Sequence, residues 1–284
     1  MPSNAVEIRG LEFSYIGAGA KVLKGVSLAI KPGEFVGVIG GIGVGKTTLL
    51  ETLNGIIPHL VKGEYSGGVE VFGKSVLASS VQEMSRSVAF VFQDPNDQLF
   101  LETVEKEASF ALENRGGLSE KQIASRVKDA LEEAGVGLLA SRDPTTLSQG
   151  QKQKVALACA IAMDADLLVL DEPTSSLDHK SSIEIYSALR RLNREGKTII
   201  ASEHDAELLA EYAKRIVLIN DGRVALDGGR EILAHPLVER LGIKVPCAVE
   251  VSKSLGLPLA FTPGELASNL RAKLSKNTKP GRMR

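Results

Sequence analysis

The sequence contains no tryptophan, and aromatic residues make up only 4% of its 284 residues. Proteins that bind single-stranded nucleic acid stack bases on aromatic side chains, so this scarcity argues against that class. Acidic and basic residues nearly balance, with 35 Asp and Glu against 34 Lys and Arg, and the net charge is −1. The chain therefore lacks the overall positive field that would indicate nucleic acid as its main partner.

Cysteine and long apolar runs are also scarce. Cys159 and Cys247 are too few for a disulfide framework or a zinc site, and Cys159 within "VALACAIAM" is typical of a small core residue. The apolar run 155–163 is far shorter than the roughly twenty residues of a membrane-spanning helix. The start "MPSNAVEIRG" lacks the basic and apolar regions of a signal peptide. We therefore expect a soluble, cytoplasmic protein whose membrane role, if any, is peripheral.

The glycine-rich stretch "GGIGVGKTTLL" is the strongest functional signal. The run "FVGVIG" that leads into it is rich in Val and predicts a buried parallel strand. Apolar residues at helical spacing after it predict a helix over 46–57. This strand–loop–helix context is the one that the G-x-x-x-x-G-K-[ST] phosphate-binding pattern requires. The residues of the pattern are Gly40, Gly45, Lys46 and Thr47.

The chemistry of phosphate binding explains this composition. Glycines let backbone N–H groups close around a polyphosphate, and the N-terminus of the following helix adds its partial positive charge. Lys46 supplies a point charge for the β- and γ-phosphates, and the Thr47 hydroxyl can ligate Mg²⁺. The stretch therefore predicts a nucleotide site with Mg²⁺.

The coarse pattern predicts an α/β fold. Alternating stretches near the N-terminus, together with "GGVEVFG", predict a small antiparallel sheet. Buried-type strands separated by helical patterns then predict a parallel sheet, and 94–165 predicts a mostly helical insertion. These strands are expected at 88–93, 167–172, 197–205 and 215–221.

We expect one domain over 1–229, ending in a hairpin near 221–229, and a helical extension over 230–284. No catalytic group of residues is visible in the extension, so an interaction role is expected. From Leu266 onward the sequence has no acid and six bases: Arg271, Lys273, Lys276, Lys279, Arg282 and Arg284. We expect a solvated tail there, with contact to anionic lipid as the alternative.

Four polar residues follow predicted buried strands. "LLVLDE" places Asp171 and Glu172 at a strand's carboxyl end, where sites of α/β proteins form. Neighbouring strand residues point to opposite faces, so we assign metal binding to Asp171 and water activation to Glu172. Gln93 after "VAFVF" can bond water or a Mg²⁺ ligand, and His204 after "TIIAS" is a candidate phosphate donor. A solvated acidic pair and a structural histidine are the alternatives.

The stretch "LSQGQKQK" places Ser148 and Gly150 ahead of a predicted helix whose first turn carries Lys152 and Lys154. Cations are normally unfavourable at a helix N-terminus unless an anion docks there. One phosphate loop already serves one nucleotide, so this second element suggests the nucleotide of a partner chain. An ordinary solvated, capped helix is an equal alternative.

In this order, the motifs resemble those of the ABC-type ATPase family over about residues 6–230. "GGIGVGKTT" is similar to its Walker A motif, "LSQGQ" to its signature, "LLVLDE" to Walker B, "SSLD" to the D-loop and "SEHD" to the switch-histidine segment. The resemblance implies a P-loop fold with a parallel-sheet core, a small antiparallel β subdomain and an inserted helical subdomain. It also implies ATP and Mg²⁺ as ligands.

The resemblance also implies a role for each motif residue. Glu172 is expected to be the general base, with His204 and Gln93 as further catalytic residues. The expected metal ligands are Thr47, Gln93 and Asp171. Ser148 and Gly150 are expected to grip the γ-phosphate held by the opposite subunit, and Tyr15 to stack on adenine. The nucleotide-binding set is Tyr15, Gly40, Gly41, Gly43, Gly45, Lys46, Thr47, Thr48, Ser148, Gly150, Gln151 and Asp178.

Within the family, "VFQDPNDQLF", "TVEKEASFALEN" and "LGIKVP" are similar to ATPase subunits of energy-coupling-factor (ECF) importers for vitamins and metal ions. The resemblance implies a head-to-tail dimer with a second ATPase, identical or paralogous, held partly by the extension over 230–284. It also implies an integral membrane subunit that contacts 93–101 at the cytoplasmic face of the membrane. The transported substrate cannot be read from this chain.

Four residues depart from the family pattern: Ile42, Val44, Gln149 and Glu203. Gln149 replaces the usual glycine of the signature. This departure bears on how strongly the signature binds the γ-phosphate, and on whether the two ATP sites of a dimer are equivalent. Three other functions stay open at this point. They are a soluble ABC ATPase acting on nucleic acid or ribosomes, an ATP-gated dimerisation module, and a P-loop small-molecule kinase.

Overall fold

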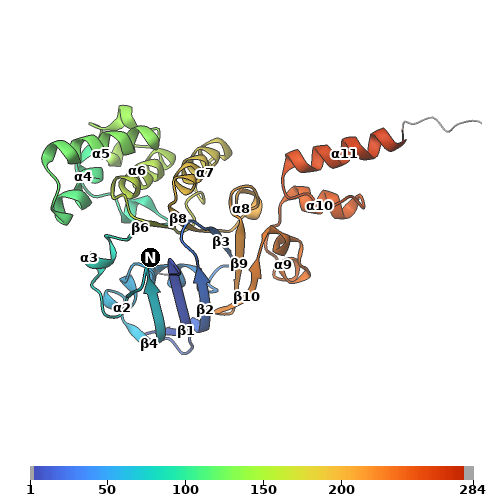
Figure 1. The fold of residues 1–284 in the computed structure, drawn as a ribbon, viewed down its shortest axis with the longest axis horizontal. Helices are drawn as coiled ribbons and strands as arrows, with labels where there is room; N and C mark the ends of the chain where they lie inside the picture. The colour runs from blue at the N-terminus through green and yellow to red at the C-terminus, as the bar shows by residue number, and fades with distance from the viewer. Residues whose placement is uncertain (1–2, 278–284) are drawn as a thin grey trace, which may run out of the picture.

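Two sheets organise the part of the chain described by the computed structural model, residues 3–277 (Figure 1). The larger sheet has the strand order β10-β9-β3-β8-β7-β6, and the smaller has the order β2-β1-β4-β5. This confirms the predicted combination of a parallel-sheet core with an antiparallel sheet. The predicted tail residues Lys279, Arg282 and Arg284 lie outside the described range.

The larger sheet is parallel except at one edge. Its parallel strands are β3 (Phe35–Ile39), β6 (Val88–Val91), β7 (Leu167–Leu170), β8 (Thr198–Glu203) and β9 (Arg215–Asn220). Every residue of β3, β7 and β8 is buried, as expected for strands covered on both faces. β10 (Arg223–Gly228) pairs antiparallel with β9 and completes the predicted hairpin.

The smaller sheet is antiparallel and alternates buried and exposed residues. Its strands are β1 (Val6–Tyr15), β2 (Leu23–Ile30), β4 (Gly63–Val71) and β5 (Lys74–Ser75). Its inner face shares an apolar cluster with β3 and with the first helix, α1 (Lys46–Glu51), and Phe13 and Leu50 are fully buried there. This packing fixes β1, and with it Tyr15, beside the start of α1.

The helix predicted over 46–57 is wrong in length. α1 ends at Glu51, and a separate short helix, α2 (Ile56–His59), follows after a turn. Gly55 adopts φ = 83°, a left-handed conformation that interrupts a right-handed helix, and the Asn54 side chain accepts a hydrogen bond from Ile56 N. The apolar spacing continues through the turn because both helices face the same core.

Three helices form a region beyond the edge strand β6, seen above the sheets in Figure 1. They are α4 (Val104–Arg115), α5 (Glu120–Glu133) and α6 (Gln149–Ala162). The helices pack around an apolar cluster of their own that includes Leu112, Leu131 and Val155. Short helical turns precede or join these helices: η1 (Pro95–Asp97), η2 (Gly137–Leu139) and η3 (Pro144–Thr146). A further short helix, α3 (Val81–Met84), lies between β5 and β6.

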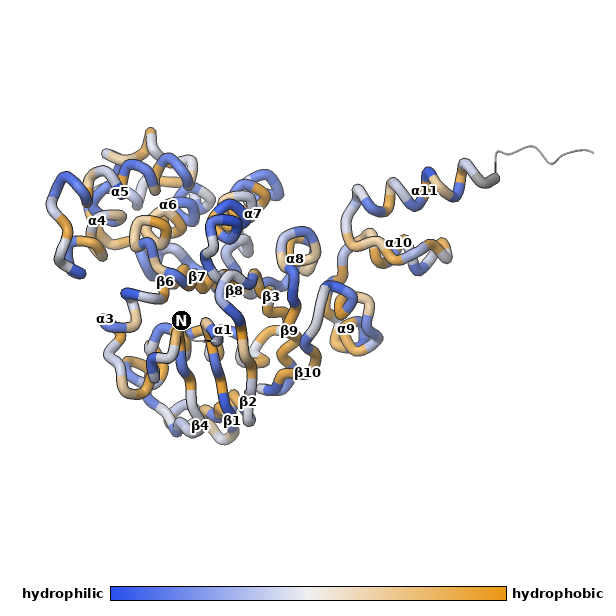
Figure 2. Tube along the Cα trace, in the orientation of Figure 1, coloured by the Kyte–Doolittle hydropathy of each residue, from blue (hydrophilic) through white to orange (hydrophobic). Residues whose placement is uncertain are grey.

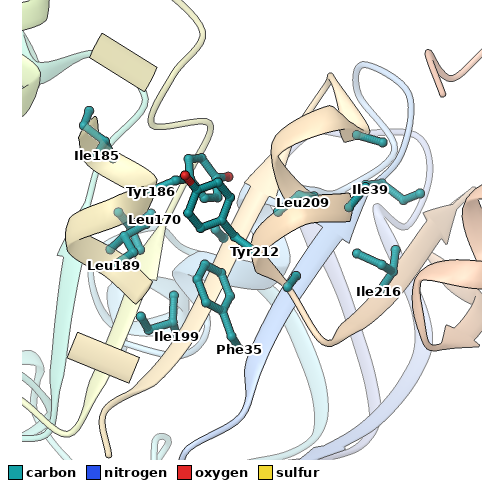
Figure 3. Close-up of a cluster of buried hydrophobic side chains, with 14 of the residues drawn as sticks. Phe35, Ile39, Leu170, Ile185, Tyr186, Leu189, Ile199, Leu209, Tyr212 and Ile216 are labelled. Atoms are coloured by element: carbon teal, nitrogen blue, oxygen red, sulfur yellow. The ribbon is translucent and has the colours of Figure 1, made fainter. Parts of the chain in front are cut away.

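Two further helices, α7 (His179–Arg194) and α8 (Ala206–Tyr212), cover one face of the larger sheet. Their apolar side chains meet those of the strands in the cluster of Figure 3. The ring of Tyr186 stacks on Phe35 with centroids 6.2 Å apart, and it lies 5.3 Å from the ring of Tyr212. This cluster joins β3, α7 and α8 into one unit.

The C-terminal elements are η4 (Arg230–Ala234), α9 (Pro236–Arg240), α10 (Cys247–Ser254) and α11 (Pro263–Asn277). α11 extends away from the sheets, and its residues alternate between hydrophilic and hydrophobic (Figure 2). Leu233, Val249 and Phe261 belong to the same apolar cluster as α7 and α8, so the part of this segment before α11 is joined to the domain by buried packing. Within residues 3–277, no helix is both long and apolar enough to cross a membrane.

Candidate functional site

The sheet order gathers most of the predicted residues at one edge. β3, β8, β7 and β6 are neighbours and run parallel, so the segments that follow them meet at their carboxyl ends. The glycine-rich loop 40–45 follows β3, and Gln93 comes shortly after β6. Asp171 and Glu172 follow β7, and His204 follows β8. Residues that are up to 164 positions apart in the sequence therefore surround one point.

A cavity of about 400 Å³ lies at this point. It is lined by Tyr15, Val22, Ile42, Gly43, Gly45, Lys46, Thr47, Thr48, Gln93, Glu172 and His204. A larger cavity of about 880 Å³ lies in the helical region, and Gln151 is the one predicted site residue in its lining. Of these two cavities, the smaller combines the glycine loop with a buried lysine and a buried carboxylate, Glu172, so it is the candidate site.

The glycine loop has backbone that other residues would not tolerate. A Cβ atom on Gly40 would lie 2.4 Å from the carbonyl oxygen of Ile219, which is closer than real Cβ contacts. Gly43 and Gly45 have φ values of 74° and 103°, in the region that glycine adopts readily. Gly45 is the N-cap residue of α1, so the loop leads directly to the unpaired N–H groups of a helix start. This is the local geometry that favours a bound phosphate.

Lys46 is buried in the loop, with 5% of its side chain exposed. Its Nζ donates hydrogen bonds to the carbonyl oxygens of Gly40 and Gly41, both at 3.1 Å. The same atom lies 3.2 Å from Glu172 Oε1. A buried cation is stable only when it is paired and hydrogen-bonded, and here the partners are the loop and Glu172. The lysine thus supplies positive charge at the start of α1.

Glu172 is the centre of the site. Its Oε2 accepts a hydrogen bond from Gln93 Nε2 at 2.8 Å and lies 2.7 Å from His204 Nε2. Its backbone has φ = 45°, a conformation that is costly for a residue with a Cβ atom. One buried carboxylate therefore contacts Lys46, Gln93 and His204. Such a carboxylate can accept a proton from water and orient the groups around it.

Asp171 faces a different set of groups. Its Oδ2 accepts from Thr47 Oγ1, and its Oδ1 accepts from Ser202 Oγ, both at 2.6 Å. The Ser202 Oγ also accepts from the backbone N–H of Glu172 at 2.9 Å. A hydroxyl and a carboxylate supply the hard oxygen ligands that Mg²⁺ prefers, so Thr47 and Asp171 fit this ion. Gln93, the third expected ligand, bonds to Glu172 instead of to these two residues.

Ser202 was not predicted from the sequence. It is fully buried in β8, where a hydroxyl needs hydrogen-bond partners. A serine within the buried run "TIIASE" was the available signal. Ser202 and His204 are two positions apart and reach Asp171 and Glu172 respectively, as the period of an extended strand requires.

The residue between them, Glu203, points toward α7. Its carboxylate accepts from Thr174 Oγ1 at 2.7 Å and from Tyr186 Oη at 3.1 Å. Burial raises the pKa of the Glu203 carboxyl to about 7, against the hydrogen bonds from Thr174 and Tyr186, which lower it. An acid that titrates near neutral pH thus lies directly behind the site.

The outer part of the cavity is aromatic and apolar. Tyr15 Oη and Thr48 Oγ1 share a hydrogen bond at 2.8 Å, and the Tyr15 ring meets Phe13 edge-on at 5.0 Å. Val22 and Ile42 complete this side, and 89% of Ile42 is exposed. Neither was predicted to line the site. These side chains offer an apolar surface beside the phosphate loop, which suits a planar base.

The remaining predicted residues lie outside this cavity. Ser148 and Gln151 form a capping box at the start of α6, with hydrogen bonds of 3.0 and 3.3 Å. Asp178 caps α7 by accepting from Ser181 N at 2.9 Å. A Cβ on Gly150 would lie 3.7 Å from Ser181 Oγ, so the two helix starts are adjacent. α6 begins at Gln149, so Gly150 is inside its first turn, whereas the sequence placed it ahead of the helix.

The lysines of α6 have partners within the chain. Lys152 Nζ donates to Asn96 Oδ1 at 2.7 Å, and Lys154 forms an ion pair with Glu184. These two cations therefore do not by themselves require an anion at the start of α6, contrary to the argument made from the sequence. The expectation of a partner's nucleotide here then depends on Ser148 and Gly150 and on the family resemblance.

Comparison with known proteins identifies relatives along most of the chain. The ABC transporter family model matches residues 23–175. A putative ABC transporter ATP-binding protein of Pyrococcus abyssi is 41% identical over 89% of this chain and 91% of its own length. The energy-coupling factor transporter ATP-binding protein EcfA of Carboxydothermus hydrogenoformans is 40% identical over 89% of this chain and 93% of its own length. A longer relative of Methanosarcina mazei is 39% identical, and the chain covers 44% of it.

Solved structures agree with this grouping. CbiO1 of Clostridium perfringens, described as part of the ABC transporter complex cbiONQ, is 34% identical with a TM-score of 0.72. The match covers 84% of this chain and 94% of that one. A dimeric ATP-binding cassette in a post-hydrolysis state, bound to ADP and Pi, is 29% identical with a TM-score of 0.71. That match covers 79% of this chain and 98% of the cassette.

Proposed function

The chain belongs to the ABC transporter family, and from this membership we propose that it is the ATPase subunit of an ECF-type importer for a vitamin or a transition-metal ion. As a member, it binds ATP and hydrolyses it for transport. The similarity to EcfA and to CbiO1 supports the finer assignment. The observation that carries the catalytic part is the single carboxylate of Glu172, which contacts Lys46, Gln93 and His204.

In the proposed mechanism, Glu172 accepts the proton of the attacking water. The Gln93 amide and the His204 imidazole both contact its Oε2, and Lys46 contacts its Oε1. These contacts restrict the carboxylate to one orientation, which is what a general base needs. His204 stays within reach of the γ-phosphate side of the cavity, where it can donate a hydrogen bond.

Nucleotide binding is assigned to the loop and its neighbours. The amides of the glycine loop and the Lys46 ammonium bind the phosphates, and the base packs on Tyr15. Thr47 and Asp171, whose oxygen atoms already lie together, are the residues that would hold Mg²⁺. When bound, Mg²⁺ neutralises charge on the β- and γ-phosphates.

We assign a second role to the cluster outside the cavity. Ser148, Gly150 and Gln151 would contact the γ-phosphate bound by a second ATPase subunit, and Asp178 would lie across the same interface. The dimeric form of a cassette with 29% identity supports a dimer, and we propose that its two chains are arranged head to tail. Because each ATP would then contact both chains, binding would close the dimer and hydrolysis would reopen it.

The partner in the membrane is proposed to dock on residues 93–101, at the cytoplasmic face. This segment starts at Gln93, beside Glu172, and it exposes Phe100, whose ring meets Phe110 of α4 at 5.3 Å. Movement of the segment would therefore change the hydrogen bond between Gln93 and Glu172, the proposed base. The extension over 230–284 is proposed to contribute to the dimer, and selectivity for the substrate to reside in another subunit.

Purification from native membranes tests this proposal. An affinity-tagged chain is solubilised in mild detergent and the intact complex is weighed by mass spectrometry. We expect a polytopic membrane protein and two ATPase subunits, and the masses also distinguish identical from paralogous ATPases. A chain recovered without any membrane protein, with turnover stimulated by DNA or RNA, would instead favour a soluble ATPase that acts on nucleic acid.

A further inference from the structure

The C-terminal segment contacts the chain directly beside His204. Asp205 and Lys244 form a parallel β-bridge, and Ala206 N donates to the carbonyl oxygen of Lys244 at 3.5 Å. The Nζ of Lys244 also forms an ion pair with the carboxylate of Asp205. The backbone and the side chain of Lys244 therefore both contact the residue that follows His204.

Asp205 holds the start of α8 as well. Its Oδ1 accepts from Glu207 N at 3.0 Å and so caps the helix, while its Oδ2 faces Lys244. Glu207 Oε1 in turn accepts from Cys247 N, at the start of α10, at 3.2 Å. The start of α8 is thus bonded to the C-terminal segment through three residues, Asp205, Ala206 and Glu207, the first of them next to His204.

The segment behind Lys244 is anchored in the core. Ile243, Val249 and Phe261 are buried in the same apolar cluster as Leu209 of α8. A shift of the C-terminal segment against α8 would open this packing. The contact between Asp205 and Lys244 therefore has buried apolar packing behind it.

The ion pair itself is open to solvent, with 69% of the Lys244 side chain and 42% of the Asp205 side chain exposed. Exposed pairs contribute little to the free energy of unfolding. The hydrogen bond with Asp205 raises the pKa of Lys244, so Lys244 stays charged at neutral pH. Its effect is therefore on orientation: it fixes the Asp205 carboxylate and the backbone on either side of it.

We propose that Lys244 is a positioning residue for His204, and that through Asp205 it makes the C-terminal segment an input to ATP hydrolysis. The proposal rests on the role given above to His204. The His204 side chain is 44% exposed and its Nε2 lies 2.7 Å from Glu172, so the backbone next to His204 helps to set where the imidazole meets that carboxylate. Displacements near 1 Å in a catalytic group lower rates steeply.

Three variants of the full-length chain test the proposal by steady-state hydrolysis. Lys244→Met removes the charge and keeps the length, Lys244→Arg restores the charge, and Lys253→Met is the control. Lys253 lies in the same segment and pairs with Glu239 at 3.6 Å, away from Asp205. We expect Lys244→Met to lower kcat about fivefold to tenfold with KM for ATP unchanged. Lys244→Arg should recover most of this loss, and Lys253→Met should match the unaltered chain.

A second readout follows the imidazole directly. The chain has four histidines, so the ring signal of His204 can be resolved by NMR and assigned with His204→Gln. We expect the signal to shift in Lys244→Met and to stay in place in Lys253→Met. An unmoved signal, an unchanged kcat, or equal losses in the Met and Arg variants would overturn the proposal. If His204 has no role in hydrolysis, His204→Gln should hydrolyse ATP as fast as the unaltered chain. That result would contradict the proposed function separately from the proposal for Lys244.

Discussion

His204 Nε2 lies 2.7 Å from Glu172 Oε2, although Glu172 follows β7 and His204 follows β8. The same oxygen accepts a hydrogen bond from Gln93. Oε2 of Glu172, which follows β7, thus contacts Gln93 after β6 and His204 after β8. A displacement of either neighbouring segment would alter a contact of the proposed base. The first experiment therefore changes Glu172 itself.

Replacing Glu172 with glutamine should abolish turnover without loss of ATP binding. The amide keeps the size of the side chain but cannot take a proton from water, and we expect hydrolysis to fall at least about a hundredfold. ATP should then accumulate with the chain in a dimer, measured by light scattering after gel filtration. Glu195→Gln, at an exposed position after α7, is the matched control. Hydrolysis by Glu172→Gln within twofold of the unaltered chain would contradict the assignment of Glu172 as the general base.

Replacing Thr47 with valine should raise the Mg²⁺ requirement. The change removes the hydroxyl that donates to Asp171 Oδ2 and keeps the branched shape. We expect the Mg²⁺ concentration for half-maximal hydrolysis to rise about tenfold. Thr145→Val removes a comparable bond, from Thr145 Oγ1 to Asp143 Oδ1, far from the site and should leave the requirement unchanged. An identical Mg²⁺ titration for both variants would argue against Thr47 as a ligand.

Replacing Gly150 with alanine should separate ATP binding from dimer formation. A Cβ there would lie 3.5 Å from Leu177 Cδ2, an ordinary contact, so the fold should be kept. The added methyl group would lie on the surface proposed to meet the partner's nucleotide. In the Glu172→Gln background we expect the dimer to be lost while each chain still binds ATP, measured by light scattering and equilibrium dialysis. Gly68→Ala, with open space around its Cβ, is the control, and a stable Gly150→Ala dimer would contradict the proposed interface.

Glu203 should make folding stability depend on pH. Its pKa is raised to about 7 by burial, so between the ordinary glutamate pKa of 4.5 and about 7 the folded chain keeps a proton that the unfolded chain releases. Stability therefore falls as pH rises through this window, by about 3 kcal/mol from this group. Glu203→Gln cannot ionise and should lack this part of the fall.

Urea unfolding at pH 5 and pH 8 measures the effect of Glu203. The difference in unfolding free energy between the two pH values should be smaller for Glu203→Gln than for the unaltered chain. Glu211→Gln, which is exposed on α8, should leave the difference unchanged. The same pH dependence in all three proteins would show that Glu203 is already ionised at pH 5.

The sequence predicted the parts of the fold that depend on local pattern. The buried strand before Gly40 and the phosphate pattern through Thr47 appear where they were expected, because runs of Val and Ile and clustered glycines act through the local backbone. The predicted helix over 46–57 failed because helical spacing also continues across a turn. Gly55 carried the missing signal, since its conformation ends a helical path.

Contacts across the sequence could not be predicted in this way. Lys244 and Asp205 are 39 positions apart, and nothing in their local sequence pairs them. The contact of Ser202 with Asp171 likewise depends on the order of strands in the sheet. The family resemblance indicated which residues share the site, and the structure adds the distances. The roles of those residues remain predictions that the variants above address.

The pairing of β7 with β8 restricts how the chain can change in length. Leu170 lies opposite Ala201, and from that point alternate residues of the second strand face the nucleotide or the α7 side. A one-residue insertion or deletion just before Ser202 would turn its hydroxyl away and swing the neighbouring Glu203 carboxyl into the cavity. Homologous chains should therefore keep a constant spacing here and vary in length at exposed loops, such as 16–21.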